Sequence, residues 1–198
     1  MKITRIRNLL LFIFLMFTII SCKREDSTLK NDLYYNNCSY EIPKGFITTF
    51  GIKEHPELFA HIICLYSESR SILQSNPTIT ITGEGDMLLL IFCSSTKEFS
   101  NSTFNFASME ELTPNTFEGF FSFDINENCA EILSYINEGS VKIEKKSSNY
   151  TISIECIDIA GKELSGYFNG KLRIEYIDNS KKFFLFENLD IINQVQIN

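Results

Sequence analysis

The stretch SVKIEKKSSNYTISIEC, from Ser140 to Cys156, decides the fold class of this chain. Apolar residues alternate with charged or polar ones on both sides of the polar letters SSN: Val141 and Ile143 before them, then Tyr150, Ile152, Ile154 and Cys156 after them. A period of two is what a β-strand needs when one of its faces is buried and the other is wet. The stretch therefore predicts two consecutive strands of an antiparallel sheet.

The alternation continues towards the C-terminus. The run KLRIEYI sets Leu172, Ile174 and Tyr176 on one face, and turn-forming letters (KSSN, DIAGKE, FNGK, DNSKK) separate the successive runs. We therefore predict a meander of about five short strands between Gly139 and Phe186.

Upstream runs are also typical of strands. TITIT (78–82) alternates, GEG (83–85) predicts a turn, and MLLLIFC (87–93) is continuously apolar, as in a strand buried on both faces. FITTFG, FAHIICLY, STFNFA and FEGFFSFDI bring the total to roughly ten or eleven strands. The predicted fold class is all-β, an antiparallel β-sandwich of about ten strands with a C-terminal meander, and a calycin-like β-barrel is the alternative.

Two segments have helical spacing. CAEILSYINEG (129–139) places Ala130, Leu133 and Ile136 three residues apart, with Gly139 as a candidate C-cap. SMEEL (108–112) has the composition of one helical turn. We expect at most short helices at these two places.

The N-terminus has the pattern of a secretory signal. Lys2, Arg5 and Arg7 precede an apolar run from Leu9 to Ile20, which only Thr18 interrupts. The run is too short to span a bilayer, which takes about 20 apolar residues, and its basic start is typical of a signal peptide.

Ile19, Ile20 and Ser21 stand directly before Cys22. This box resembles the lipobox of bacterial lipoproteins. The resemblance implies that residues 1–21 are removed and that Cys22 becomes the acylated first residue, a lipid anchor (palmitate or a similar chain) in the membrane. One acyl chain anchors only marginally, and lipoproteins of this class carry two or three. The alternatives are an ordinary signal peptide with a chance cysteine and an uncleaved anchor.

Residues 22–38 are polar and charged, and we expect them to form a flexible tether to a β-rich domain at 39–198, which is one unit or two packed halves. KRED within the tether resembles the charged surface-export signals of Bacteroidetes lipoproteins, and a plain solvated tether is the alternative. The expected location is that of an outer-membrane lipoprotein, periplasmic or on the cell surface.

Charge and cysteine content narrow the function classes. Loss of residues 1–21 removes three basic residues and no acidic ones, so the net charge of −7 becomes −10. A domain with this negative charge is poorly suited to bind nucleic acid, because phosphate contacts need Lys and Arg. Acylation of Cys22 would leave an odd number of cysteines that form one or two disulfides or stay as buried thiols: Cys38, Cys64, Cys93, Cys129 and Cys156.

No constellation for catalysis or metal binding stands out. His55 and His61 are six apart and do not form HExxH. Asp124, Asn126 and Asn128 begin like an EF-hand loop, but Cys129 replaces its glycine and Tyr135 its glutamate. A glycosidase needs two carboxylates, and nothing selects a pair among these acids: Glu84, Asp86, Glu110, Glu111, Asp124 and Glu127. Tryptophan is absent, so a sugar-stacking platform would need Tyr34, Tyr35 and Tyr40.

The strand phrases ITGEGDMLLLIF and GSVKIEKKSSNYTISIECIDIAGKELSGYFNGKL are similar to the body of uncharacterised Bacteroidetes lipoproteins. The resemblance covers about half of the mature chain and implies a β-rich envelope domain with no assigned activity. We expect a non-catalytic, lipid-anchored domain without cofactor or metal that binds a protein or glycan partner or joins a surface assembly. The alternatives are a barrel for a small hydrophobic ligand and a glycan-acting hydrolase.

Overall fold

The computed structural model describes residues 30–75, 78–99, 101–108, 113–124 and 132–174. These residues form strands and connecting turns, with no helix among them. The strands are β1 (Asp32–Tyr35), β2 (Cys38–Glu41), β3 (Lys44–Ile52), β4 (His55–Tyr66), β5 (Ser71–Ser75), β6 (Thr78–Thr82), β7 (Met87–Ser94), β8 (Ser102–Phe106), β9 (Thr116–Phe123), β10 (Ile132–Lys146), β11 (Asn149–Asp158), β12 (Glu163–Lys171) and β13 (Arg173–Ile174).

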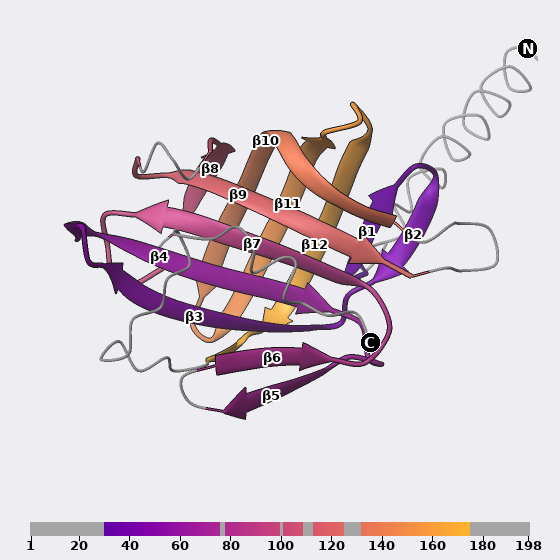
Figure 1. The fold of residues 1–198 in the computed structure, drawn as a ribbon, viewed down its shortest axis with the longest axis horizontal. Helices are drawn as coiled ribbons and strands as arrows, with labels where there is room; N and C mark the ends of the chain where they lie inside the picture. Colours follow the sequence, from indigo (N-terminus) through magenta and orange to yellow (C-terminus); the bar gives the residue numbers. More distant parts are fainter. Residues whose placement is uncertain (1–29, 76–77, 100, 109–112, 125–131, 175–198) are drawn as a thin grey trace, which may run out of the picture.

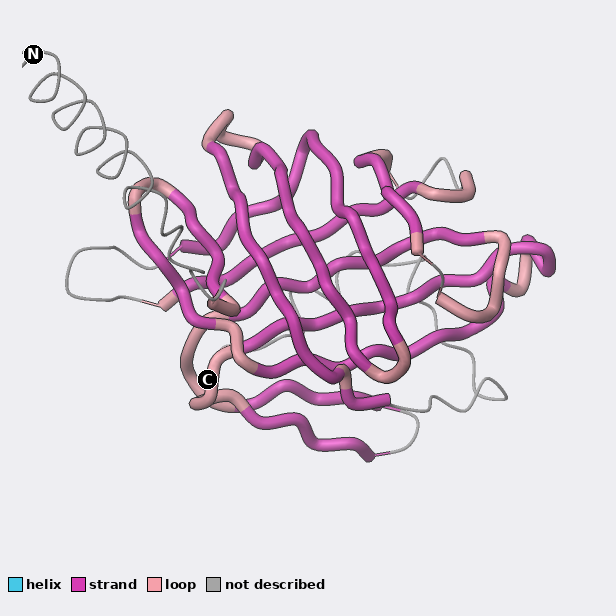
Figure 2. Tube along the Cα trace, turned by 180° about the vertical axis from the view of Figure 1, so that it is seen from behind, coloured by secondary structure: helices cyan, strands magenta, loops and turns pink. Residues whose placement is uncertain are grey.

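Eleven strands form one sheet in the order β13-β3-β4-β7-β9-β8-β10-β11-β12-β1-β2, and β5 and β6 form a separate hairpin. The large sheet is mixed, because β8–β9 and β13–β3 are parallel pairs. It curls into a half-barrel. We call β3, β4, β7 and β9 the front layer and β10, β11 and β12 the back layer, and the back strands cross the front ones at a steep angle (Figures 1 and 2). The all-β prediction is confirmed, but the predicted purely antiparallel arrangement is wrong, because the large sheet contains these two parallel pairs.

The main core lies between the two layers. It draws large side chains from the front layer and from the back layer: Ile63, Phe92 and Phe121 on one side, Val141, Ile152 and Phe168 on the other. In β11, Tyr150, Ile152, Ile154 and Cys156 are all buried, as their period-two spacing predicts. The prediction for MLLLIFC is also confirmed, because β7 is buried or half-buried along both faces.

β10 joins the layers and corrects one prediction. Its first residues pair with β9, and its last residues pair with β11 and β8. The helix predicted across CAEILSYINEG is wrong for residues 132–139, which are strand. Hydrogen-bonding partners on neighbouring strands override the local helical spacing of Leu133 and Ile136. SMEEL lies mostly outside the described residues.

A bend in β10 turns the strand from one layer to the other. The register with β11 shifts between Ile136 and Glu138, and the backbone of Gly139 has φ of 122°. A bulge followed by a glycine with positive φ is the usual way in which a strand turns a corner between crossed layers. Gly139 is therefore the corner itself rather than a helix cap.

The tether predicted for residues 22–38 is wrong for residues 32–38. β1 and β2 form a hairpin there, with Leu33 and Tyr35 buried in the main core. Asn36 and Asn37 both have positive φ, as a two-residue hairpin turn requires. The sequence signal was Asn-Asn between two short apolar runs, and it was missed because each run is only four residues long. The meander is confirmed through β12, and residues 175–198 lie outside the described part of the chain.

Candidate functional site

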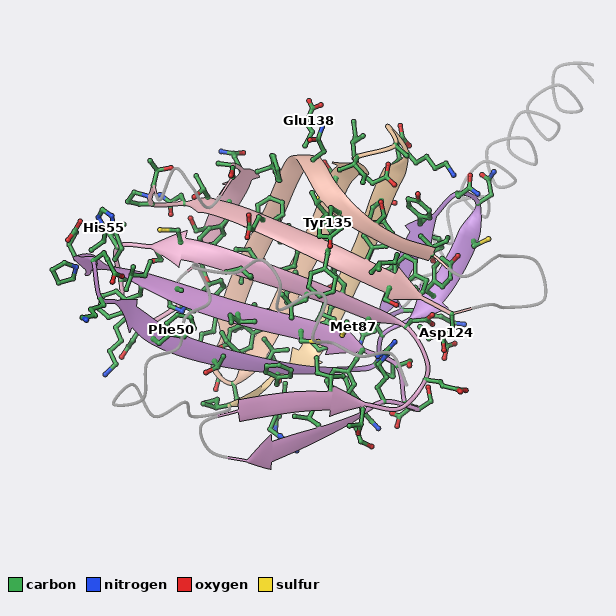
Figure 3. The ribbon with its side chains drawn as sticks, viewed as in Figure 1. Phe50, His55, Met87, Asp124, Tyr135 and Glu138 are labelled. Carbon is green, nitrogen blue, oxygen red and sulfur yellow. The ribbon has the colours of Figure 1, made fainter. Side chains whose placement is uncertain are left out.

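Two of the predicted acidic candidates, Asp86 and Asp124, meet at one end of the front layer. β7 begins at Met87 and β9 ends at Phe123, and Met87 is paired with Ser122 across the antiparallel ladder. The residue before β7 and the residue after β9 are therefore neighbours. Figure 3 labels Met87 and Asp124 at this end of the layer.

Each aspartate accepts a hydrogen bond from the other's strand connection. The Asp124 backbone N–H donates to Oδ1 of Asp86 at 3.1 Å, and the Gly85 N–H donates to Oδ2 of Asp124. The Asp86 N–H in turn donates to Oγ of Ser67 at 3.1 Å. We call Ser67, Arg70, Asp86 and Asp124 the aspartate clasp, because these bonds tie three chain segments together.

Arg70 completes the clasp. Its guanidinium is buried, and its Nε–H donates to the carbonyl of Gly85 at 2.6 Å. Burial raises the pKa of the Asp86 carboxyl, as does the nearby Asp124 carboxylate, while the Asp124 N–H and Arg70 act in the opposite direction. A raised carboxyl pKa is a property of general acids. Here, however, both carboxylates already hold backbone N–H groups, which is a structural use.

Tyr40 lies near the clasp. Its ring stacks on Phe123 with centroids 4.0 Å apart, and its buried hydroxyl has no hydrogen-bond partner within the described part of the chain. Burial, followed by the charge of Asp86, raises the pKa of this phenol. Because its phenol stays neutral, Tyr40 adds no second negative charge beside the partly buried Asp86 carboxyl. A phenol with this pKa does not serve as a base near neutral pH.

His61 is a core residue. Its ring is 0% exposed and packs edge-on against Phe99. Nε2 lies 3.1 Å from the carbonyl oxygen of Thr96, which only accepts, so Nε2 carries the proton and Nδ1 accepts from the Thr49 hydroxyl at 2.8 Å. Burial lowers the pKa of His61 to about 4, against a smaller opposing effect of the Thr96 carbonyl. The imidazole is neutral and fully used.

His55 stands apart from His61. It begins β4 at the far end of the front layer, where its exposed ring lies 3.6 Å from a carboxylate oxygen of Glu57 (Figure 3). Among the described residues, no group of three His, Cys, Asp or Glu side chains could hold a metal ion. The two histidines therefore do not combine into a site.

Asp158, whose carboxylate accepts four hydrogen bonds from other described residues, was missed by sequence reasoning. It is buried, and its Oδ2 accepts from the Tyr35 hydroxyl at 2.6 Å and from the Ser134 hydroxyl at 2.8 Å. Its Oδ1 accepts from the backbone N–H groups of Ala160 and Lys162, at 2.9 and 2.8 Å. Burial by itself raises the pKa of this carboxyl, but the four hydrogen bonds outweigh it and the pKa lies below its usual value.

Asp158 connects β11, β10 and the N-terminal hairpin through one side chain. The signal that could have found it is its phase, because it continues the buried series Tyr150, Ile152, Ile154, Cys156 at the next even position. A carboxylate in phase with a core face, followed by the turn letters IAGK, predicts a buried turn anchor.

The remaining candidate residues do not come together in one site. Glu84 is exposed, Tyr34 is 52% exposed, and Tyr35 and Tyr40 are buried, so the tyrosines do not form one stacking platform. Cys64, Cys93 and Cys156 are buried free thiols, and burial raises the pKa of each. Cys38 is disulfide-bonded. Outside the described residues lie Cys22, Glu110, Glu111, Asn126, Glu127, Asn128 and Cys129.

No known protein family matches this chain, and neither a curated protein nor a solved structure matches it. Within the part of the chain that the structure describes, no helix is long and apolar enough to cross a membrane.

Proposed function

We propose that this chain is a lipid-anchored, extracytoplasmic domain that binds a partner or joins a surface assembly and catalyses no reaction. The observation that supports the non-catalytic part is the use of its buried polar groups. The polar groups of His61, Asp158 and the aspartate clasp already form hydrogen bonds with backbone or hydroxyl partners. Active sites instead leave a reactive group free to reach substrate.

The anchored part rests on the box Ile19-Ile20-Ser21-Cys22 and on where the fold begins. With β1 starting at Asp32, only residues 23–31 would separate an acylated Cys22 from the sheet. A flexible segment of that length spans about 15–18 Å on average. The domain would then sit directly above the lipid headgroups, and its partner would be another envelope component.

Aromatic packing supports a two-layer sandwich over a ligand-binding barrel. Between the layers, the ring of Phe92 lies 4.7 Å from that of Phe104 and 5.2 Å from that of Phe99, centroid to centroid. Phe99 and Phe104 stack at 5.4 Å. Side chains that interdigitate in this way fill the interior of a sandwich, whereas a calycin-like barrel keeps a central space for its ligand.

Membrane fractionation of cells that express the full chain tests the anchor. Cys22→Ser should move the protein from the membrane to the soluble fraction, and the matched variant Ser21→Ala should leave it in the membrane, because alanine keeps a small residue before the cysteine. The mass of the N-terminal peptide should show acylated Cys22 in the wild type. Retention of Cys22→Ser in the membrane would refute the anchor, whatever the partner.

Crosslinking in intact cells tests the partner. The wild type should give a discrete adduct with another envelope component, and the soluble Cys22→Ser protein should lose it because it no longer stands at the membrane. Hydrolysis of a glycan substrate by the purified chain, abolished in both Asp86→Asn and Asp124→Asn, would overturn the non-catalytic assignment.

A further inference from the structure

The front layer is apolar on both of its faces. The face turned away from the back layer, which we call the outer face, carries one row of aligned neighbours across five strands: Phe46, Cys64, Leu89, Phe120 and Tyr135. The next rows continue with Ile62 beside Ile91, and Ala60 beside Cys93. Figure 3 shows Phe50, Met87 and Tyr135 on the near side of this layer. A face of this composition needs a cover.

The β5–β6 hairpin covers one half of the outer face. Ile72 and Ile81, which are paired across the hairpin, pack against the cluster of Phe46, Cys64, Tyr66, Met87 and Phe120. The cover and the covered strands are therefore both within the described chain at this half.

In the other half, the cluster that the described residues form has no member from outside the front layer. A second buried cluster, which we call the Phe50–Cys93 patch, consists of Phe50, Ile52, Leu58, Ala60, Ile62 and Cys93, with Leu89 and Ile91 at its border. All of these residues belong to β3, β4 and β7, so every described member comes from the same layer. Yet Cys93 is 0% exposed and Ile62 is 7% exposed. A single layer does not bury its own outward side chains.

Thr48 gives an independent sign of a missing neighbour. It stands on β3 between Phe46 and Phe50 on the same face, and it is 2% exposed. Its Oγ1 is buried without a hydrogen-bond partner among the described residues. Burying a hydroxyl away from water without a hydrogen-bond partner is unfavourable. A covering backbone would supply both the burial and an acceptor.

We propose that the C-terminal segment, residues 175–198, docks on the Phe50–Cys93 patch. The last described strand, β13, pairs in parallel with β3 through Ile174 and Ile47, so the described chain ends at the edge of the front layer. The 24 remaining residues reach about 80 Å when extended, whereas crossing β3, β4 and β7 takes only about 15 Å.

The composition of this segment fits the patch. It contains the run FFLF at 183–186 and the alternating letters of LDIINQVQI at 189–197, which are typical of a strand with one apolar face. Other undescribed segments fit poorly. Residues 1–29 enter at β1, near the opposite end of the sheet order, and the short segments 109–112 and 125–131 each contain two glutamates.

Cys93 is a built-in probe of the proposal. It is a free thiol inside the patch, while Cys64 is a free thiol beneath the β5–β6 hairpin and Cys156 is one in the main core. In the full chain, purified in detergent, all three should react slowly with an alkylating reagent. In a variant that stops after Ile174, Cys93 should react about tenfold faster or more, while Cys64 and Cys156 stay protected.

One control and three further outcomes complete this test. A synthetic peptide of residues 175–198 should restore the protection of Cys93 in the truncated chain. Protection that persists in a monomeric truncated chain would overturn the proposal, and so would protection that depends on protein concentration, because a second copy would then be the cover. Equal exposure of all three thiols would indicate general unfolding, and photo-crosslinking in the full chain then decides.

A photo-crosslinking residue at position 91 tests contact in the intact chain. Ile91 borders the patch and is only half-buried, so the sheet should accept a larger side chain there. We expect crosslinked peptides from residues 175–198 of the same molecule. The same residue placed at position 133, which is 52% exposed on β10, is the matched control and should not give them. Crosslinks from position 91 to any other segment, or between two copies, would refute the proposal.

Discussion

His61 lets the pH response of the core be predicted at the scale of one residue. Its pKa in the folded chain is about 4, against an ordinary value of 6.5, so between these pH values the unfolded chain binds more protons. Folding stability should therefore fall as the pH drops from about 6.5 to 4, by up to about 3 kcal/mol. Urea titrations at successive pH values measure this.

His61→Gln provides the comparison, because glutamine can still donate to the Thr96 carbonyl and does not titrate. At pH 7 the variant should be less stable than the wild type. Between pH 6.5 and 4 its free energy of unfolding should change less with pH. An equally steep fall in the variant would assign the pH response to other groups.

Asp158 should matter through its charge-assisted hydrogen bonds. Asp158→Asn replaces an oxygen that accepts from two hydroxyls, and we expect a loss of about 2–3 kcal/mol in the free energy of unfolding. Tyr35→Phe removes only one of the four bonds and should cost about 1 kcal/mol.

Because the folded pKa of Asp158 lies below its usual value, its contribution is present above about pH 4 and is lost as the pH falls further. An Asp158→Asn protein as stable as the wild type would contradict this.

At the scale of the element, the corner in β10 carries the next prediction. A Cβ at Gly139 would collide with the Glu155 carbonyl oxygen, and the positive φ of Gly139 disfavours any L-residue. We expect Gly139→Ala to cost about 3 kcal/mol or more.

Gly51→Ala in β3 is the matched control. A Cβ there would meet nothing within 4 Å, so alanine should change stability by about 0.5 kcal/mol or less. Thermal unfolding followed by circular dichroism suits both variants, since the chain contains no tryptophan. Equal effects of the two substitutions would argue against Gly139 as a fixed corner.

At the scale of the whole molecule, the number of free thiols is a prediction that involves all six cysteines. Cys64, Cys93 and Cys156 are free, and Cys38 is disulfide-bonded, so the partner of Cys38 is none of these three. If Cys22 is acylated, a denatured chain should therefore show three thiols without reductant and five with it. An unacylated Cys22 gives four and six.

Thiol titration in denaturant separates these counts, and Cys22→Ser should reproduce the numbers of the acylated chain. The native chain should show almost no reactive thiol, because the three free cysteines are buried. In the acylated chain or in Cys22→Ser, a rapidly reacting native thiol would contradict the burial of these three residues.

The sequence predicted the presence of a strand wherever the apolar alternation was long. It did not predict which strands pair with each other. β11 follows from Tyr150, Ile152, Ile154 and Cys156 alone, since a period of two has one structural explanation. The four-residue strands of the β1–β2 hairpin were missed, because a pattern that short is indistinguishable from a linker. β10 was misread in its first half, because Leu133 and Ile136 have helical spacing and the pairing that overrides it comes from β9.

The aspartate clasp could not be assembled from sequence for the same reason. Asp86 and Asp124 are 38 residues apart, and only the pairing of β7 with β9 makes them neighbours. Nothing in the local letters distinguishes them from Glu84, which is exposed.

From the sequence alone it follows that this chain forms strands and that its largest apolar run in the sheet is buried on both faces, and the N-terminus resembles that of a lipoprotein precursor. These properties depend on residues close together in the chain, whose spacing fixes which face is apolar. The three-dimensional structure was needed to see that β10 bends between two layers, that His61 and Asp158 are structural, and that part of the outer face needs a cover. Those properties depend on which distant strands pair, and pairing is set by the burial of the whole sheet rather than by any one segment.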